Sequence, residues 1–306
     1  MKTIQTLKNI GKWAVYGILG ILFLVVLVYF YSERRYNKTK DAELVFPPVN
    51  IDIPSDSASI TRGAHLFTVY NCRECHMDNL AGKVMIDDPL LGYVKTANLT
   101  KGKGGLPNDF NDQDWLQALK HGVDKNNKPL IVMPSEESSR LPDKDVADII
   151  AYCKSMPPVD NDLGPQNLHP LAKILFAFGK LDLFPALKIN HIINPIAKPE
   201  EVISEDFGAT LAISCTGCHR ENYGGGPPLA PGHPVVPDIS STGRPGKWTE
   251  EQFINTIRTG ITPEGHHLKN ENMPWQSYKE YSDVELKSVR KYILTFPKKT
   301  ADANHN

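Results

Sequence analysis

The chain has 306 residues, 41% of them hydrophobic and 23% charged, which is typical of a globular protein with room for two domains. Its net charge of −1 excludes a general nucleic-acid binder. The charge is uneven, because residues 1–43 hold seven Lys and Arg against three Asp and Glu, whereas residues 44–157 hold twelve against fifteen and residues 200–297 nine against thirteen.

Residues 1–40 predict a membrane anchor. The run from Trp13 to Tyr31 holds nineteen residues without a charge, enough for a helix to cross a bilayer. Lysines precede it, Arg34 and Arg35 follow it, and aromatic residues lie near both ends. A cleaved signal peptide is the alternative, but its apolar core is normally shorter and ends at a small-residue site. We therefore predict an uncleaved signal anchor with a transmembrane helix over about 13–31.

Four of the five cysteines fall into two C-x-x-C-H motifs, which are Cys72-Arg-Glu-Cys75-His76 and Cys215-Thr-Gly-Cys218-His219. This pattern is the attachment signature of c-type haem. The four thiols would form thioethers to two covalently bound haem c groups, and each histidine would bind an iron. A zinc site, a redox C-x-x-C or a disulfide framework are the alternatives, although a disulfide framework does not need the histidines. The fifth thiol, Cys153, is predicted to be a small buried side chain.

The two halves of the chain repeat one order of features. A short helix precedes each motif; a loop with Gly or Pro, a helix ending at glycine, a Met-Pro pair and a last helix follow it. Nineteen residues separate Met133 from Tyr152, and nineteen separate Met273 from Tyr292. Apolar residues three and four apart predict helices, and strands should be few. Asp143 and Ser282 are expected as N-caps or first-turn residues of the last helices. Domain one has the longer insertion, with 43 residues from Cys72 to Trp115 against 33 from Cys215 to Trp248.

We therefore predict an all-α protein in which a transmembrane helix precedes two tandem domains. Domain one covers residues 41–157, domain two covers residues 204–298, and residues 299–306 form a tail. Residues 158–203 are rich in proline at both ends and too apolar between them for a free linker. We expect short helices that pack against one or both domains, with the membrane surface or a partner subunit as the alternative.

The predicted sixth ligands of the two irons are the methionines of the Met-Pro pairs. Met133 lies 57 residues after His76, and Met273 lies 54 residues after His219. Methionine opposite histidine raises the reduction potential of a haem. The local alternatives are Met85 and His121 in domain one, and His266 and His267 in domain two.

The repeat resembles the class I cytochrome c family, in which an N-terminal helix, a CxxCH motif, a Pro-Leu loop, a methionine loop and a C-terminal helix follow in order. The resemblance covers about two thirds of the chain. The order of features is similar to that of cytochrome c subunits of membrane-bound dehydrogenases and of oxidase-linked di-haem cytochromes. By resemblance, Pro89 and Pro228 or neighbours would accept a hydrogen bond from the haem histidines. Trp115 and Trp248 either reach a haem propionate or anchor their helices.

These features predict an electron-transfer protein and not an enzyme. It would carry electrons between a quinol-oxidising complex or dehydrogenase and a terminal oxidase of a respiratory chain, with its domains on the periplasmic side of the cytoplasmic membrane. Donor and acceptor proteins would be its partners, and no nucleic acid or small-molecule substrate is expected. The alternative is a di-haem peroxidase-like enzyme with one open haem site.

Overall fold

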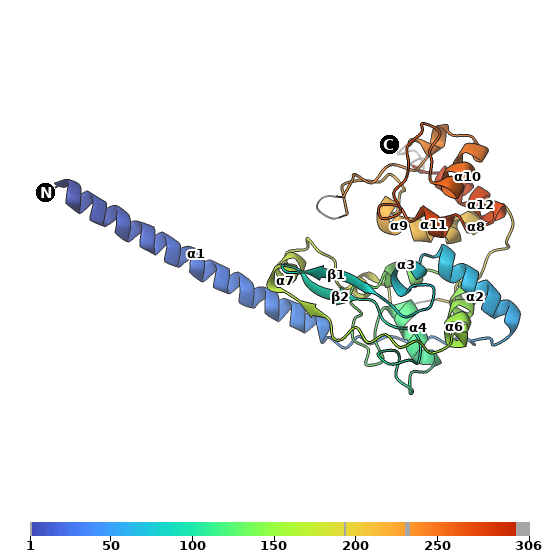
Figure 1. Ribbon diagram of the computed structural model, residues 1–306, viewed down its shortest axis with the longest axis horizontal. Coiled ribbons are helices and arrows are strands. Elements are labelled where there is room, and N and C mark those ends of the chain that lie inside the picture. The colour runs from blue at the N-terminus through green and yellow to red at the C-terminus, as the bar shows by residue number, and fades with distance from the viewer. Residues whose placement is uncertain (1, 193, 230–232, 298–306) are drawn as a thin grey trace, which may run out of the picture.

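The computed structural model describes residues 2–192, 194–229 and 233–297. Helix α1 (Lys2–Lys40) extends far from the rest of the molecule, and two helical domains follow it side by side (Figure 1). The predicted fold class, mostly helical with a long apolar N-terminal helix, is confirmed. Residues 11–40 of α1 are long and apolar enough to cross a membrane.

Both domains are built from the same order of helices. Domain one contains α2 (Ser57–Val69), α3 (Arg73–His76), α4 (Asp112–His121), α5 (Ser135–Ser138) and α6 (Asp143–Ser155). Domain two contains α8 (Glu205–Leu211), α9 (Ile213–His219), the 3₁₀ turn η2 (Pro245–Lys247), α10 (Glu250–Thr259), α11 (Trp275–Tyr278) and α12 (Asp283–Ile293). The order of features predicted for the repeat is therefore found in space as well as in sequence.

A glycine lets the first and last helices of each domain cross closely. In domain one α2 packs on α6, and in domain two α8 packs on α12. A Cβ atom at Gly63 would lie 1.9 Å from the carbonyl oxygen of Asp148, and one at Gly208 would lie 2.0 Å from that of Ser288. Any larger residue would push the two helices apart, since protein interiors have almost no free space.

Reciprocal caps set where the helices after the motifs begin. Asn111 and Asp114 form a capping box at α4, and Thr249 and Gln252 form one at α10. Both helices end at a glycine in the left-handed conformation, Gly122 and Gly260, as predicted from the sequence. Ser282 is the N-cap of α12, and Asp143 lies in the first turn of α6 after Pro142, which confirms both expectations.

The longer insertion of domain one forms a small antiparallel sheet. Strands β1 (Val84–Asp88) and β2 (Gly92–Lys95) make a hairpin, and β3 (Asn167–Leu168), from the segment between the domains, pairs with β2 through Gly92 and Leu168. Helix α7 (Pro170–Ala177) and the 3₁₀ turn η1 (Pro185–Lys188) follow β3. The segment thus packs on domain one, because the hairpin offers it a sheet edge.

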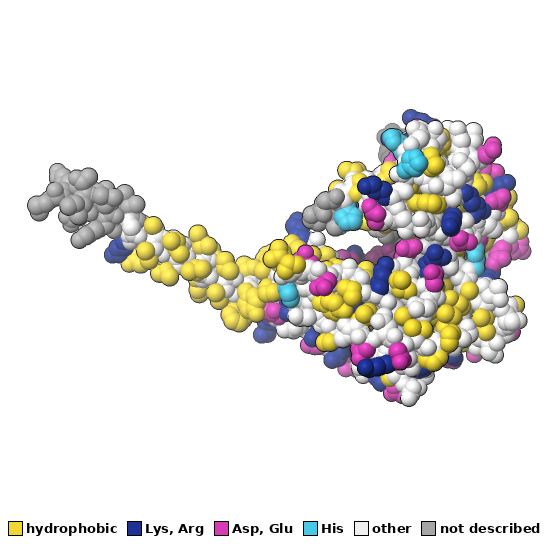
Figure 2. Space-filling view, in the orientation of Figure 1, with side chains coloured by type: hydrophobic (Ala, Val, Ile, Leu, Met, Phe, Trp, Pro, Cys, Tyr) yellow, Lys and Arg dark blue, Asp and Glu magenta, His cyan; other side chains and the backbone are white. Residues whose placement is uncertain are grey.

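The last turns of α1 belong to this part of domain one. Tyr36 is buried in an apolar cluster with Leu168, Ala172 and Phe184, and Glu33 pairs with Lys173 at 2.7 Å. From residue 13 to residue 31, apolar side chains cover α1 on all sides and most of them are exposed. Figure 2 shows them as a yellow surface that runs up to domain one.

We predict that Gly208→Ala destabilises domain two. The new methyl group would collide with a backbone carbonyl of α12, and overpacking of this kind costs about 1–3 kcal/mol. Thermal unfolding measures the loss. Gly224→Ala is the control, because a Cβ there meets only the side chain of Asn222, at 3.3 Å. Equal stability of the two variants would contradict the predicted role of the crossing.

Candidate functional site

The histidine of each CxxCH motif is held by one hydrogen bond to a backbone carbonyl. Nδ1 of His76 lies 3.0 Å from the carbonyl oxygen of Ala97, and Nδ1 of His219 lies 2.8 Å from that of Pro237. In this arrangement Nδ1 carries the proton and Nε2 keeps a free lone pair. Burial lowers the pKa of both imidazoles, which favours the neutral form that binds metals.

A glycine six residues after each histidine makes room for that carbonyl. Gly82 and Gly225 have positive φ, and each donates its N–H to the carbonyl of the motif histidine at 3.1 Å. A Cβ at Gly82 would lie 2.7 Å from the oxygen of Ala97, and one at Gly225 would lie 2.5 Å from that of Pro237. The sequence analysis missed these glycines, although their identical spacing from the two motifs was visible.

The carbonyls of Pro89 and Pro228, the expected acceptors, do not bond the motif histidines; those of Ala97 and Pro237 do. Pro89 lies in the turn of the β1–β2 hairpin, where its oxygen is 3.0 Å from Nδ1 of His169. Pro228 is exposed. In both domains the acceptor lies further along the loop than the first Pro-Leu pair, 21 residues after His76 and 18 residues after His219.

Domain two has a cavity of about 450 Å³, in the range of ligand-binding pockets. Its walls are mostly apolar and bring together the predicted attachment and ligand residues, Cys215, Cys218, His219 and Met273. Burial raises the pKa of the Cys215 thiol to about 12, so this thiol is neutral. An apolar slot with two thiols, a neutral imidazole and a thioether fits a covalently bound metalloporphyrin.

In domain one the same local geometry holds the methionine loop. Pro134 and Pro274 have nearly identical backbone angles, φ −76° and ψ 57° against φ −75° and ψ 57°. The carbonyls of Met133 and Met273 each accept a hydrogen bond from the N–H two residues on, at 2.7 Å. Met133 is half-buried against the same apolar core as Cys72.

The residues considered as alternatives to the two methionine ligands lie on exposed surfaces or in other contacts. Met85 is exposed on β1. His121 stacks on Phe46 and has its Nδ1 3.0 Å from Nδ1 of His191, so it belongs to the contact between α4 and the segment linking the domains. His266 and His267 are exposed, and His267 also lines the cavity.

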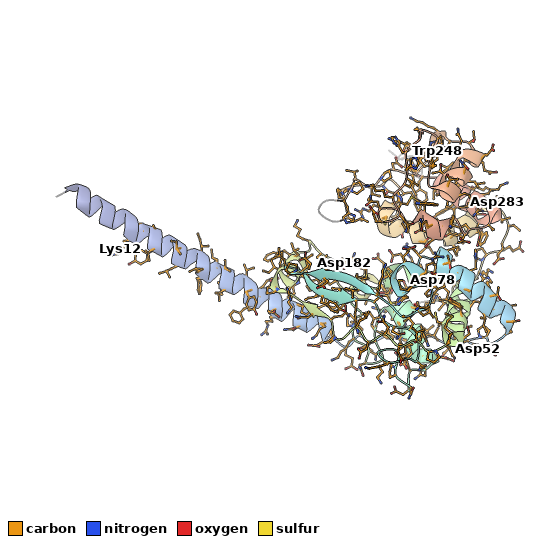
Figure 3. All side chains as sticks on the ribbon, viewed as in Figure 1. Lys12, Asp52, Asp78, Asp182, Trp248 and Asp283 are labelled. Carbon is orange, nitrogen blue, oxygen red and sulfur yellow. The ribbon has the colours of Figure 1, made fainter. Side chains whose placement is uncertain are left out.

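The two tryptophans do not occupy equivalent positions. Counted from the N-caps, Trp115 of α4 corresponds to Phe253 of α10, and Trp115 packs edge-to-face against Phe110 in the core. Trp248 lines the cavity on the outer side of domain two (Figure 3), where its indole N–H donates to Glu264 at 2.8 Å.

Each CxxCH turn also contacts the other domain. The Ser277 hydroxyl of α11 donates to Glu74, between the cysteines of the first motif, at 2.7 Å. Arg140, just after α5, donates to Thr216, between the cysteines of the second motif, and to Glu221, both at 2.8 Å. The segment after each Met-Pro pair therefore lies against the attachment turn of the other domain.

One apolar core continues across this boundary. Leu66 and Phe67 of domain one belong to the same buried cluster as Phe207 and Leu211 of domain two. The hydroxyl of Tyr281 lies 3.2 Å from the carbonyl oxygens of both Val69 and Leu211, one in each domain. At the edge of the boundary, His65 pairs with Glu285 at 2.8 Å. The two domains therefore pack as one body.

Comparisons with known proteins match both domains to cytochromes. The family described as "Cytochrome C oxidase, cbb3-type, subunit III" matches residues 58–153, and the family described as "Cytochrome c" matches residues 206–297. The chain carries two cytochrome c domains. It is therefore an electron carrier, and domains of this family imply covalently bound haem c.

Curated relatives of this di-domain cytochrome c are cytochrome subunits of dehydrogenases. The cytochrome c subunits of alcohol dehydrogenase (quinone) from Gluconacetobacter polyoxogenes and Komagataeibacter europaeus are each 22% identical, over 79% of this chain and 57% of the relative. The gluconate 2-dehydrogenase cytochrome c subunit of Pantoea cypripedii is 28% identical over 33% of this chain and 24% of the relative. The chain thus spans just over half the length of the first two.

We predict that pairing of the two cytochrome domains weakens as pH rises above neutrality. The hydrogen bond to Glu285 raises the pKa of His65 above its ordinary 6.5. Stabilisation by this pair is therefore complete below about pH 6.5 and is lost as pH rises through the raised pKa. The difference in thermal midpoint between wild type and His65→Gln should be largest near pH 6 and smaller at alkaline pH. A difference that is the same at both pH values would contradict the assignment.

His266→Gln is the matched control for this titration. The side chain of His266 is exposed on a loop of domain two, 19 residues before Glu285. The variant should follow the wild-type curve at every pH.

Proposed function

We propose that this cytochrome is a membrane-anchored carrier with two haem c groups, one in residues 41–157 and one in residues 204–298. The observation that supports it best is the cavity of domain two, where both motif cysteines, His219 and Met273 line one apolar space. When bound, haem c supplies an iron that accepts and releases one electron.

The chain's own residues set the conditions for that exchange. We infer that Cys72 and Cys75, with their counterparts Cys215 and Cys218, hold the haems by thioether bonds. His76 with Met133, and His219 with Met273, would be the axial ligands. The hydrogen bonds from Nδ1 to Ala97 and Pro237 keep each imidazole in the tautomer that presents Nε2 to the iron.

The domain boundary supports transfer between the two sites. Because each attachment turn is contacted by the other domain, the haem edges joined to the cysteines would lie toward a shared, packed boundary. Figure 1 shows α3 of domain one and α9 of domain two on the sides that face each other. An electron that enters one domain could thus pass to the other within the same molecule.

We further infer that α1 is retained as an anchor and places both domains on the outer side of the cytoplasmic membrane. The burial of Tyr36 and the pair between Glu33 and Lys173 make the end of α1 part of domain one. The names of the relatives support a dehydrogenase or another quinol-oxidising enzyme as the electron donor. A terminal oxidase of the respiratory chain is the proposed acceptor.

Met273→Ala tests the axial assignment. Loss of the thioether ligand should lower the reduction potential of one haem by about 0.1 V or more, against the ~0.8 V range set by axial ligands. Haem attachment should stay complete. Redox titration with low-temperature EPR measures both. Met85→Ala is the control, because Met85 is exposed on β1. An unchanged potential would refute the ligand assignment, and high-spin iron in the wild type would favour the peroxidase-like alternative.

Arg140→Ala tests the route between the domains. Removal of its bonds to Thr216 and Glu221 should loosen the boundary and slow electron equilibration between the haems several-fold, with both potentials unchanged. Injection of one electron by pulse radiolysis, followed optically, measures this rate. Arg258→Ala is the matched control, since Arg258 pairs with Asp283 within domain two. Equal rates in all three proteins would mean that this contact does not support transfer.

A further inference from the structure

Helix α7 is apolar on both of its faces. Its inner face packs on the end of α1, with Ala172 and Ala177 buried and Phe176 against Tyr36 and Phe184. Its outer face carries a second apolar stripe at positions i, i+3, i+4 and i+7, made by Leu171, Ile174, Leu175 and Phe178. The stripe is partly open to solvent, since Leu171 is 39% and Phe178 54% exposed. A helix that is apolar all round normally lies in a protein core or in a membrane.

The stripe lies at the level where the charge-free run of α1 ends. The ring of Phe178 is 6.0 Å from that of Tyr31, the last residue of the run. Two residues further along α1, Glu33 pairs with Lys173 of α7. In Figure 2 the yellow surface of α1 continues without a break onto this end of domain one. A membrane that covers the apolar run of α1 would therefore reach the stripe as well.

The hairpin turn adds a third exposed apolar side chain beside α7. Leu90, in the turn between β1 and β2, is 63% exposed. His169, the residue before α7, donates its N–H to Leu91 and has its Nδ1 3.0 Å from the oxygen of Pro89. The turn is therefore fixed next to the first turn of α7. We call Leu90 and the α7 stripe together the collar.

Basic side chains follow both apolar segments. Arg34 and Arg35 are exposed directly after the run of α1, and Lys180 is exposed directly after α7. Arg35 also donates to the hydroxyl of Tyr31 at 3.1 Å. A tyrosine with neighbouring cations is the arrangement found at the headgroup layer of membranes, where the ring lies among the lipids and the cations bind phosphate.

We propose that the collar inserts into the headgroup–acyl boundary of the same membrane that α1 spans. The inference rests on the proposed role of α1 as an anchor. Domain one would then lie on the bilayer through two contacts, α1 and the collar, instead of moving freely on a single helix. Interfacial helices bury their apolar face about 5–10 Å into this layer. The collar would thus fix the direction in which the two haem sites face quinol-oxidising partners in the membrane.

Photolabelling of the full-length, haem-loaded protein tests the proposal. The protein is placed in nanodiscs of phosphatidylethanolamine and phosphatidylglycerol that include a phospholipid with a diazirine on its acyl chain near the headgroup. Mass spectrometry then maps the labelled peptides. We expect label in α1, in residues 170–180 and in residues 88–92, and none above background in α12. Label confined to α1 would overturn the proposal and leave a protein partner as the occupant of the collar.

The same map separates this inference from the proposed function. If α1 itself is unlabelled, the anchor is wrong and the collar has no basis. If α1 is labelled, haem content and potentials are as proposed, and residues 170–180 are unlabelled, only the collar is wrong.

Charged variants show whether apolar insertion causes the labelling. Leu171→Asp combined with Phe178→Asp should reduce label in residues 170–180 several-fold, while label in α1, haem content and both potentials stay unchanged. Leu90→Asp, in an exposed turn, gives an independent second test at residues 88–92. The control is Val284→Asp, at a side chain of α12 that is 37% exposed. Persistence of the label in the Asp variants would overturn the proposal.

Discussion

Each cytochrome domain depends on the close crossing of its first and last helices at a glycine. Because Gly63 and Gly208 have no side chain, α2 and α8 can lie directly on the backbone of α6 and α12. The CxxCH turn follows the first helix of each pair, and the Met-Pro turn precedes the last. Closing the helix pair therefore brings together the two segments that supply the attachment site and the proposed sixth ligand, although more than fifty residues separate them.

A second constraint acts around the motif histidines. An imidazole that binds iron needs its other nitrogen bonded to an acceptor, and here a backbone carbonyl serves in both domains. A backbone acceptor puts no requirement on the side chain at that position, and Ala97 and Pro237 indeed differ. The requirement falls instead on Gly82 and Gly225, where a side chain would occupy the space that the carbonyl needs.

The segment after each Met-Pro pair contributes both to its own domain and to the boundary between the domains. Arg140 and Ser277 come from equivalent segments after the two methionines, and each reaches between the cysteines of the opposite motif. The boundary is nonetheless not symmetric in chemistry, since one contact is made by a guanidinium and the other by a hydroxyl. The described part of the segment from 158 to 203 packs mainly on domain one, where β3 pairs with the hairpin and α7 packs on the end of α1.

The sequence by itself determined the features whose information is local. Two CxxCH motifs, the Met-Pro pairs, the helix periodicity and a nineteen-residue uncharged run each lie within a short stretch, and they predicted the helical fold class and the two cytochrome domains. Only the tertiary structure decided which carbonyls accept from the histidines, that Trp115 corresponds to Phe253, and that the apolar linker packs on α1. Those contacts depend on where loops of unequal length return in space. Between the motif and the N-cap of the next helix, domain one has five more residues, 39 from Cys72 to Asn111 against 34 from Cys215 to Thr249, so counting along the chain paired the wrong tryptophans.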